Sequence, residues 1–238
     1  MEKLVEGARK LGLHLTSGQV DLFQQYYEQL REWNKRVNLT RIIERDSVQK
    51  KHFLDSLTVV QALLDMNPPA RRLLDVGSGA GLPGLPIKIL WPHIHLGLMD
   101  SVGKKTAFLQ SVVTSLGLRD VEVLTSRAED LARSEAHRER YDAVLCRAVA
   151  PLPTLMELTL PFCKLGGRVI AQKMASAEGE IARSGKALRL LGGEVQEVRR
   201  VELDELEPPR VLVIVEKVAT TPDKYPRRAG VPARHPLM

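Results

Sequence analysis

Residues 73–84 read LLDVGSGAGLPG, a short apolar run that ends in Asp75-Val76 and continues into glycines at alternate positions. Glycines between a strand and a helix let the backbone turn sharply and approach a bound cofactor closely. From Gly79 onward the stretch also fits the GxGxxG fingerprint of dinucleotide-binding proteins. The motif therefore predicts a strand–loop–helix unit for a nucleotide-like cofactor, without naming that cofactor.

From Arg72 onward, short apolar segments alternate with helix-length segments. The predicted strands are RLLDV, IHLGLMD, VEVLTS, YDAVLCR and GRVIAQK, and the predicted helices lie near residues 86–91, 104–116, 129–132, 152–162 and 178–191. This alternation predicts a parallel, doubly wound α/β sheet. Two more strands, EVQEVRRVEL and RVLVIVEKV, flank the turn DELEPP, which suits an antiparallel hairpin. A mainly parallel Rossmann-like sheet that ends in such a hairpin is typical of Class I methyltransferases.

Helical segments precede this sheet. After the cap-like Thr16-Ser17, apolar residues recur at helical spacing, and a second helix is predicted from about residue 47 to 64. We assign Trp33 to the core, and we favour helix packing over catalysis for His52 and Asp55. The predicted organisation is an N-terminal helical extension (1–68), a cofactor-binding domain (69–218) and a basic C-terminal tail (219–238).

The composition is that of a globular protein with a basic surface. Of 238 residues, 44% are hydrophobic and 27% are charged, and a net charge of +6 favours a polyanionic partner such as nucleic acid. No apolar run approaches the roughly 20 residues that cross a bilayer, and the N-terminus lacks the apolar stretch of a signal peptide. Metal-ligand spacing is absent around Cys146 and Cys163. We therefore expect a cytoplasmic protein with no membrane association and no metal.

Acidic residues near the glycine loop favour S-adenosylmethionine over NAD as cofactor. Asp75 could face the cationic amino group of S-adenosylmethionine, whereas it would repel a pyrophosphate; it could equally cap the loop backbone. Asp100 ends the second strand, where a carboxylate accepts hydrogen bonds from ribose hydroxyls, a feature that NAD enzymes share. The backbone of Ala128 and Glu129 follows the third strand and could pair with adenine, although these residues would also suit a helix N-terminus.

Several separate stretches together resemble one family. LLDVGSGAGLPGLPIKI, LMDSVGKKTAFL, SRAEDL, LCRAVAPL, WNKRVNLT, HFLDSL and KYPRRAGVPARHPL are similar to the bacterial RsmG family, also called GidB, over about residues 26–237. The resemblance implies an S-adenosylmethionine-dependent enzyme that methylates guanine N7 at position 527, in the 530 loop of 16S ribosomal RNA. The partner would be that RNA or the small ribosomal subunit.

The resemblance also implies site residues. The cofactor contacts of the family fall at Gly77, Leu82, Ala128, Glu129 and Arg147, with Asp100 and Ser101 at the ribose position, and we add Asp75, Gly79 and Gly81 from the loop. Basic positions of the family, which could serve cofactor or RNA, fall at Arg127, Arg147, Lys173 and Arg210.

The chemistry of N7 methylation requires no general base. N7 presents a lone pair and carries no proton, so catalysis depends on placing it in line with the methyl group. Arg147 and Lys173 are candidates for positioning. Arg147 could donate to O6 and N7 of the base or hold the cofactor carboxylate, and we favour the carboxylate because a cation on N7 would block attack. It could also pair with an acid such as Glu129.

The remaining basic residues are candidates for RNA binding. They are Arg199, Arg200, Lys224, Arg227, Arg228 and Arg234. The Arg- and Pro-containing tail is expected to order on RNA or to stay solvated, and to contribute nothing to cofactor affinity. Three alternatives compete with this interpretation: a methyltransferase that acts on a protein or small molecule, an NAD-dependent oxidoreductase, and an RNA-binding protein without activity. We expect a monomer.

Overall fold

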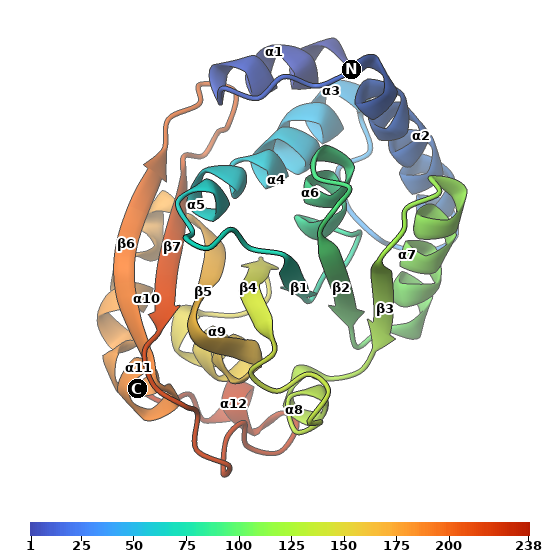
Figure 1. The fold of residues 1–238 in the computed structure, drawn as a ribbon. Coiled ribbons are helices and arrows are strands. Elements are labelled where there is room, and N and C mark those ends of the chain that lie inside the picture. The colour runs from blue at the N-terminus through green and yellow to red at the C-terminus, as the bar shows by residue number, and fades with distance from the viewer.

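The glycine loop connects a central strand to a helix in the computed structural model, which describes residues 1–238. Seven strands form one sheet in the order β3-β2-β1-β4-β5-β7-β6 (Figure 1). Their bounds are β1 (Arg72–Val76), β2 (His95–Asp100), β3 (Val121–Thr125), β4 (Tyr141–Arg147), β5 (Cys163–Met174), β6 (Gly193–Val201) and β7 (Arg210–Lys217).

The pairing of these strands confirms the predicted fold class. Strands β1 to β5 pair in parallel, while β7 pairs antiparallel with both β5 and β6. The predicted C-terminal hairpin is therefore present. Strand order reverses between β1 and β4, and a crevice for ligands opens at the carboxyl ends of the strands at such a switch point.

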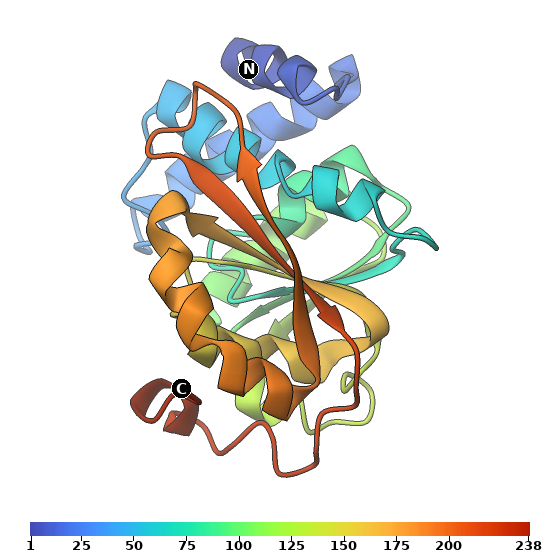
Figure 2. The same cartoon turned by 90° about the vertical axis from the view of Figure 1, so that its left-hand side faces the viewer.

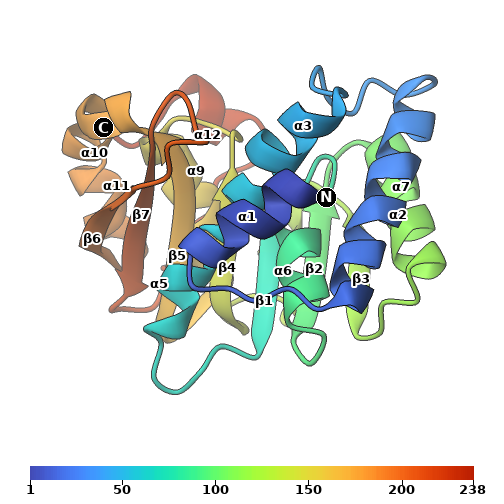
Figure 3. The same ribbon diagram turned by 90° about the horizontal axis from the view of Figure 1, so that it is seen from above.

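Helices cover both faces of the sheet (Figures 2 and 3). In chain order they are α1 (Glu2–Lys10), α2 (Ser17–Asn34), α3 (Arg45–Val48), α4 (Asp55–Leu57), α5 (Val60–Leu64), α6 (Gly84–Leu90), α7 (Gly103–Ser115), α8 (Ala128–Leu131), α9 (Leu152–Thr159), α10 (Glu178–Arg183), α11 (Gly185–Leu191) and α12 (Val231–Arg234). A π-helical turn (Gln49–Leu54) joins α3 to α4, and 3₁₀ turns span Leu160–Phe162 and Ala175–Ala177.

Two predicted helices are broken. The segment 47–64 contains the π-helical turn and ends in the separate helix α5, and the segment 178–191 divides at Ser184. The Ser184 hydroxyl donates to the Ile181 carbonyl at 2.6 Å, so this buried side chain satisfies a backbone group where the helix is interrupted.

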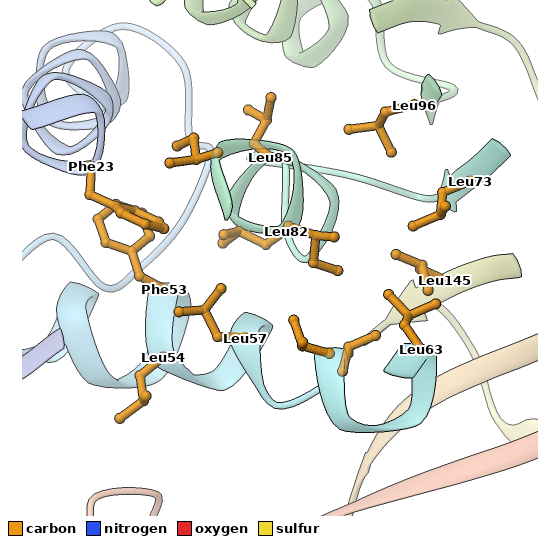
Figure 4. Close-up of a cluster of buried hydrophobic side chains, with 14 of the residues drawn as sticks. Phe23, Phe53, Leu54, Leu57, Leu63, Leu73, Leu82, Leu85, Leu96 and Leu145 are labelled. Carbon is orange, nitrogen blue, oxygen red and sulfur yellow. The ribbon is translucent and has the colours of Figure 1, made fainter. Parts of the chain in front are cut away.

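Alternation along the strands creates two cores. Leu73 and Leu145 point to the face that the N-terminal helices, α6 and α7 cover, where they join Phe23 and Phe53 in one cluster (Figure 4). Their neighbours, such as Leu74, point to the face covered by α8, α9 and α11. Trp33 packs against the first core, edge-on to Phe108 with ring centroids 5.8 Å apart, as expected.

The C-terminal tail is docked on the protein, contrary to both expectations for it. Tyr225 and Leu237 are buried in the second core, because the tail offers apolar side chains between its charges. Its last helix, α12, packs against α9. None of the helices combines the length and apolar character that crossing a membrane would require.

Candidate functional site

Backbone hydrogen bonds hold the glycine loop against the end of β2. The amides of Gly77 and Ser78 donate to the Met99 carbonyl at 2.8 and 2.9 Å, and the Gly79 amide donates to Asp100 Oδ2 at 3.0 Å. Gly77 adopts a φ of +73°, and a Cβ there would lie 2.6 Å from a methyl group of Val149. Glycine is therefore required at this position for both conformation and space.

The Asp75 side chain supports the loop through a hydrogen bond to the loop backbone. Its side chain is fully buried, its Oδ2 accepts a hydrogen bond from the Gly84 amide at 2.9 Å, and it does not line the cavity described below. Of its two proposed roles, this geometry favours the backbone cap. Burial raises the pKa of the Asp75 carboxyl from 3.8 to about 7.

A cavity of about 350 Å³ opens beside the loop at the carboxyl ends of the strands. Six of the residues singled out from the sequence line it together: Gly77, Asp100, Ser101, Arg127, Ala128 and Glu129. The apolar part of its lining includes Val76, Met99 and Leu158. A cavity of this size, mostly apolar with a few polar groups, suits a nucleoside-sized ligand.

Other predicted cofactor residues lie outside this lining. Gly79 acts through its bond to Asp100, and Leu82 is buried in the first core. A Cβ on Gly81 would lie 2.8 Å from the Tyr26 hydroxyl. The group that lies close to this glycine is therefore a side chain of α2 and not a ligand. These residues shape the loop from which Gly77 reaches the cavity.

The structure adds residues that the sequence analysis missed. Lys105, Thr154, Gly230 and Ala233 also line the cavity. Lys105 lies in the first turn of α7, with its Nζ 3.5 Å from Asp100 Oδ2. Gly230 and Ala233 come from the tail, so the expectation that the tail contributes nothing to the cofactor site disagrees with the lining of this cavity.

A second cavity, of about 420 Å³, adjoins the first and contains the basic residues expected near the substrate. Its lining includes Arg147, Lys173 and Arg210, together with His52 and Asp55. Arg147 Nη1 lies 2.9 Å from Asp55 Oδ2, and Arg210 Nε lies 3.4 Å from Asp55 Oδ1. The ion-pair partner of Arg147 is therefore Asp55, not Glu129, and Arg147 lines the second cavity, not the first.

His52 and Lys173 are each held by neighbours within this second cavity. Lys173 Nζ donates to Glu180 Oε2 and to the Ala150 carbonyl, both at 2.7 Å. His52 Nε2 lies 2.9 Å from the Thr40 hydroxyl, and burial, with the nearby Arg147 charge, lowers the pKa of His52 from 6.5 to about 4. The imidazole is consequently neutral near pH 7. Sequence analysis assigned His52 and Asp55 to helix packing and missed their place in this cavity.

Ala148 forms part of the wall of both cavities. It directly follows β4 and adopts a φ of +56°, which is a strained conformation for a residue with a Cβ. Strained backbone of this kind concentrates at functional sites, where the surrounding structure holds it.

The candidate RNA-binding residues fall into two groups. Arg200, Lys224, Arg228 and Arg234 are exposed. Arg199 instead pairs with Asp65 and Glu197, and Arg227 pairs with the fully buried Glu157. Because an unpaired buried carboxylate is costly, we assign Arg227 a structural role.

The switch-point cavity, its glycine loop and the acid at the end of β2 define a Class I, S-adenosylmethionine-dependent methyltransferase. Solved structures show the same fold: precorrin-6y C5,15-methyltransferase from Geobacter metallireducens GS-15 (TM-score 0.51, 15% identity, 68% of this chain and 88% of that chain) and ribosomal protein L11 methylase from Lactobacillus delbrueckii subsp. bulgaricus (TM-score 0.53, 13% identity, 71% and 79%).

Sequence comparison resolves the family within this class. Residues 19–207 match the model of the GidB family, rRNA small subunit methyltransferase G. Proteins named ribosomal RNA small subunit methyltransferase G are 50% identical in Dehalococcoides mccartyi and 48% identical in Roseiflexus castenholzii, each over 238 residues and all of both chains. This chain belongs to the rRNA small subunit methyltransferase G family, and the predicted family is confirmed.

We expect the Asp100→Ala variant to bind S-adenosylhomocysteine about tenfold to a hundredfold more weakly than the wild type, because a charged acceptor of hydrogen bonds is lost. Calorimetric titration measures this, with Glu122→Ala as a control on an exposed strand position. Asp100 also holds the loop, so an analogue without the ribose 2′-hydroxyl is titrated as well. If this analogue loses equal affinity on both proteins, Asp100 does not contact the ribose.

The raised pKa of Asp75 predicts a pH-dependent stability. The folded protein retains this proton up to about pH 7, whereas the unfolded chain releases it near 3.8. The stabilisation is therefore present at acidic pH and is lost as the pH rises from about 4 to 7, by up to a few kcal/mol. Urea unfolding of the wild type and Asp75→Asn across this range should give stability curves that diverge; parallel curves would contradict the raised pKa.

Proposed function

We propose that this chain transfers a methyl group from S-adenosylmethionine to N7 of guanosine 527, in the 530 loop of 16S ribosomal RNA. The observation that carries this proposal is the junction of two cavities at Ala148: one suits a nucleoside cofactor, and the other is lined with cations beside it. Family membership and the basic surface support the RNA substrate.

The residues of the first cavity fit S-adenosylmethionine. The Asp100 carboxylate accepts from the amides of Gly79 and Val102, which leaves acceptor capacity for ribose hydroxyls. The backbone at Ala128 and Glu129 lies where adenine would be held, beside apolar side chains. When bound, this cofactor supplies an electrophilic methyl group on a sulfonium.

The second cavity would receive the guanine. Arg147 and Lys173 are held by Asp55 and Glu180, so their positions are fixed before the base arrives. These side chains would orient the base and attract the neighbouring phosphates of the RNA. N7 itself carries no proton that would have to be removed. N7 lies in the deep groove of an RNA helix, so the target must be unpaired or extruded to reach this cavity.

RNA contact would extend from this cavity to other cations of the chain. Arg200 and Arg210 lie near one end of the β6–β7 pair, in register with the carboxyl end of β5. Arg127 is exposed at the rim of the cofactor cavity, and Lys224, Arg228 and Arg234 are exposed on the tail. The proposed enzyme acts as a monomer in the cytoplasm, where ribosomes assemble.

Mass mapping of 16S ribosomal RNA tests the proposal. RNA and small subunits from cells without the gene are incubated with the protein and S-adenosylmethionine, and nuclease fragments are analysed for 7-methylguanosine. We expect the modification at position 527 with the wild type and a much reduced yield with Asp100→Ala. A methyl group on another atom or nucleotide, or none on either substrate, would overturn the proposal.

We further expect methyl transfer to show no requirement for a base. The single-turnover rate, with RNA and cofactor saturating, should be nearly flat between about pH 6 and 9, where an ordinary histidine base begins to titrate. His52 is already neutral throughout this range, since its pKa is about 4. A steep rise with a single ionisation, abolished by one side-chain replacement that still permits RNA binding, would show that a base is required.

A further inference from the structure

The C-terminal segment 226–238 faces the cofactor cavity and the solvent at once. Gly230 and Ala233 line the cavity, while Arg228 and Arg234, one or two residues away from them, are exposed cations. Figure 1 shows α12 next to α8 and α9. The same short segment therefore meets two chemically different surroundings.

The segment is firmly anchored on α9. Arg227 makes a forked ion pair with Glu157, with Nη2–Oε2 at 2.6 Å and Nε–Oε1 at 2.9 Å, and its amide donates to the same carboxylate at 2.7 Å. Glu157 is fully buried, so these bonds satisfy a charge that has no access to water. Thr154 adds a hydrogen bond to the Pro232 carbonyl at 3.2 Å.

At the cavity itself a second lining side chain, that of Glu129, also holds the segment. The Gly230 amide donates to Glu129 Oε1 at 2.9 Å, and Glu129 lines the cavity from the start of α8. Gly230 adopts a φ of +80°, while a Cβ there would meet nothing closer than 3.7 Å. The glycine is thus needed for the conformation that aims its amide at Glu129, not for space.

We propose that segment 226–238 is the outer wall of the cofactor site, that Glu129 positions it by binding the Gly230 amide, and that this wall couples cofactor binding to RNA binding. A cofactor in the cavity favours the wall in its docked position, and RNA phosphates on Arg228 and Arg234 favour the same position. Each ligand then strengthens the other by an equal factor. The coupling rests on the proposed function, because it requires that RNA be the second ligand.

Two variants weaken the contact between Glu129 and Gly230. Glu129→Ala removes the acceptor and retains the backbone, and Gly230→Ala strains the donor. We expect both to bind S-adenosylhomocysteine on the order of tenfold more weakly without RNA, by calorimetry. Glu135→Ala, an exposed acid beyond α8, is the matched control and should bind it as the wild type does. Hydrogen exchange of residues 226–238 should slow with S-adenosylhomocysteine in the wild type and less in the variants.

The coupling is measured as the affinity for a 16S ribosomal RNA fragment with and without saturating S-adenosylhomocysteine. We expect the ligand to tighten RNA binding about fivefold or more in the wild type, and to have a smaller effect in both variants. Unchanged cofactor affinity in folded variants, or wild-type RNA affinity that ignores the ligand, overturns the proposal. Failure of the proposed function gives another result, since the wild type would then neither bind nor methylate this RNA.

Discussion

The Asp100 carboxylate is the interaction on which the site depends. It accepts hydrogen bonds from the Gly79 and Val102 amides, and so joins the loop after β1 to the turn after β2. The side chain is only 7% exposed, so these donors replace hydrogen bonds that water cannot supply. Because the loop is fixed from the β2 side, Gly77 can face the cavity in a conformation that a larger residue would not adopt. Asp75, by contrast, holds the other end of the loop by accepting a hydrogen bond from the Gly84 amide, and it does not line the cavity.

The second cavity has an excess of positively charged side chains in its lining. In the second cavity, cations outnumber carboxylates: Lys51, Arg147, Lys173 and Arg210 face only Asp55 and Glu180. The carboxylates fix the cations by short contacts without neutralising all of them, which leaves a positive site for a polyanion. Burial, together with the charge of Arg147, lowers the pKa of His52, so its imidazole is neutral near pH 7. This arrangement favours binding and orientation of an RNA base, and it offers no group poised to exchange protons near pH 7.

Local patterns predicted the fold well, because strand alternation, glycine turns and helix spacing are properties of neighbouring residues. Asp100, at the end of β2, and Ala128 were also predicted to lie near each other, since parallel strands bring their carboxyl ends to one edge, and both line the first cavity. Partners distant in sequence were not found. Asp55 is 92 residues from Arg147, and Gly230 is 101 residues from Glu129. No spacing rule connects such pairs. Nor did the sequence indicate that Arg227 forms an ion pair with the buried Glu157 instead of facing solvent.

The N-terminal helices and the tail are parts of the site as well as of the fold. His52 and Asp55 come from the N-terminal extension, and the π-helical turn 49–54 places His52 toward the second cavity. A π-helical turn inserts a residue and shifts the side chains that follow, a feature that recurs at functional sites. The tail contributes Gly230 to the first cavity. The central sheet alone would therefore present the cofactor loop with an open outer wall and Arg147 without its acidic partner. A largely enclosed guanidinium without a carboxylate would be destabilising and loosely placed, so the two cavities have their final shape only when the extensions are docked.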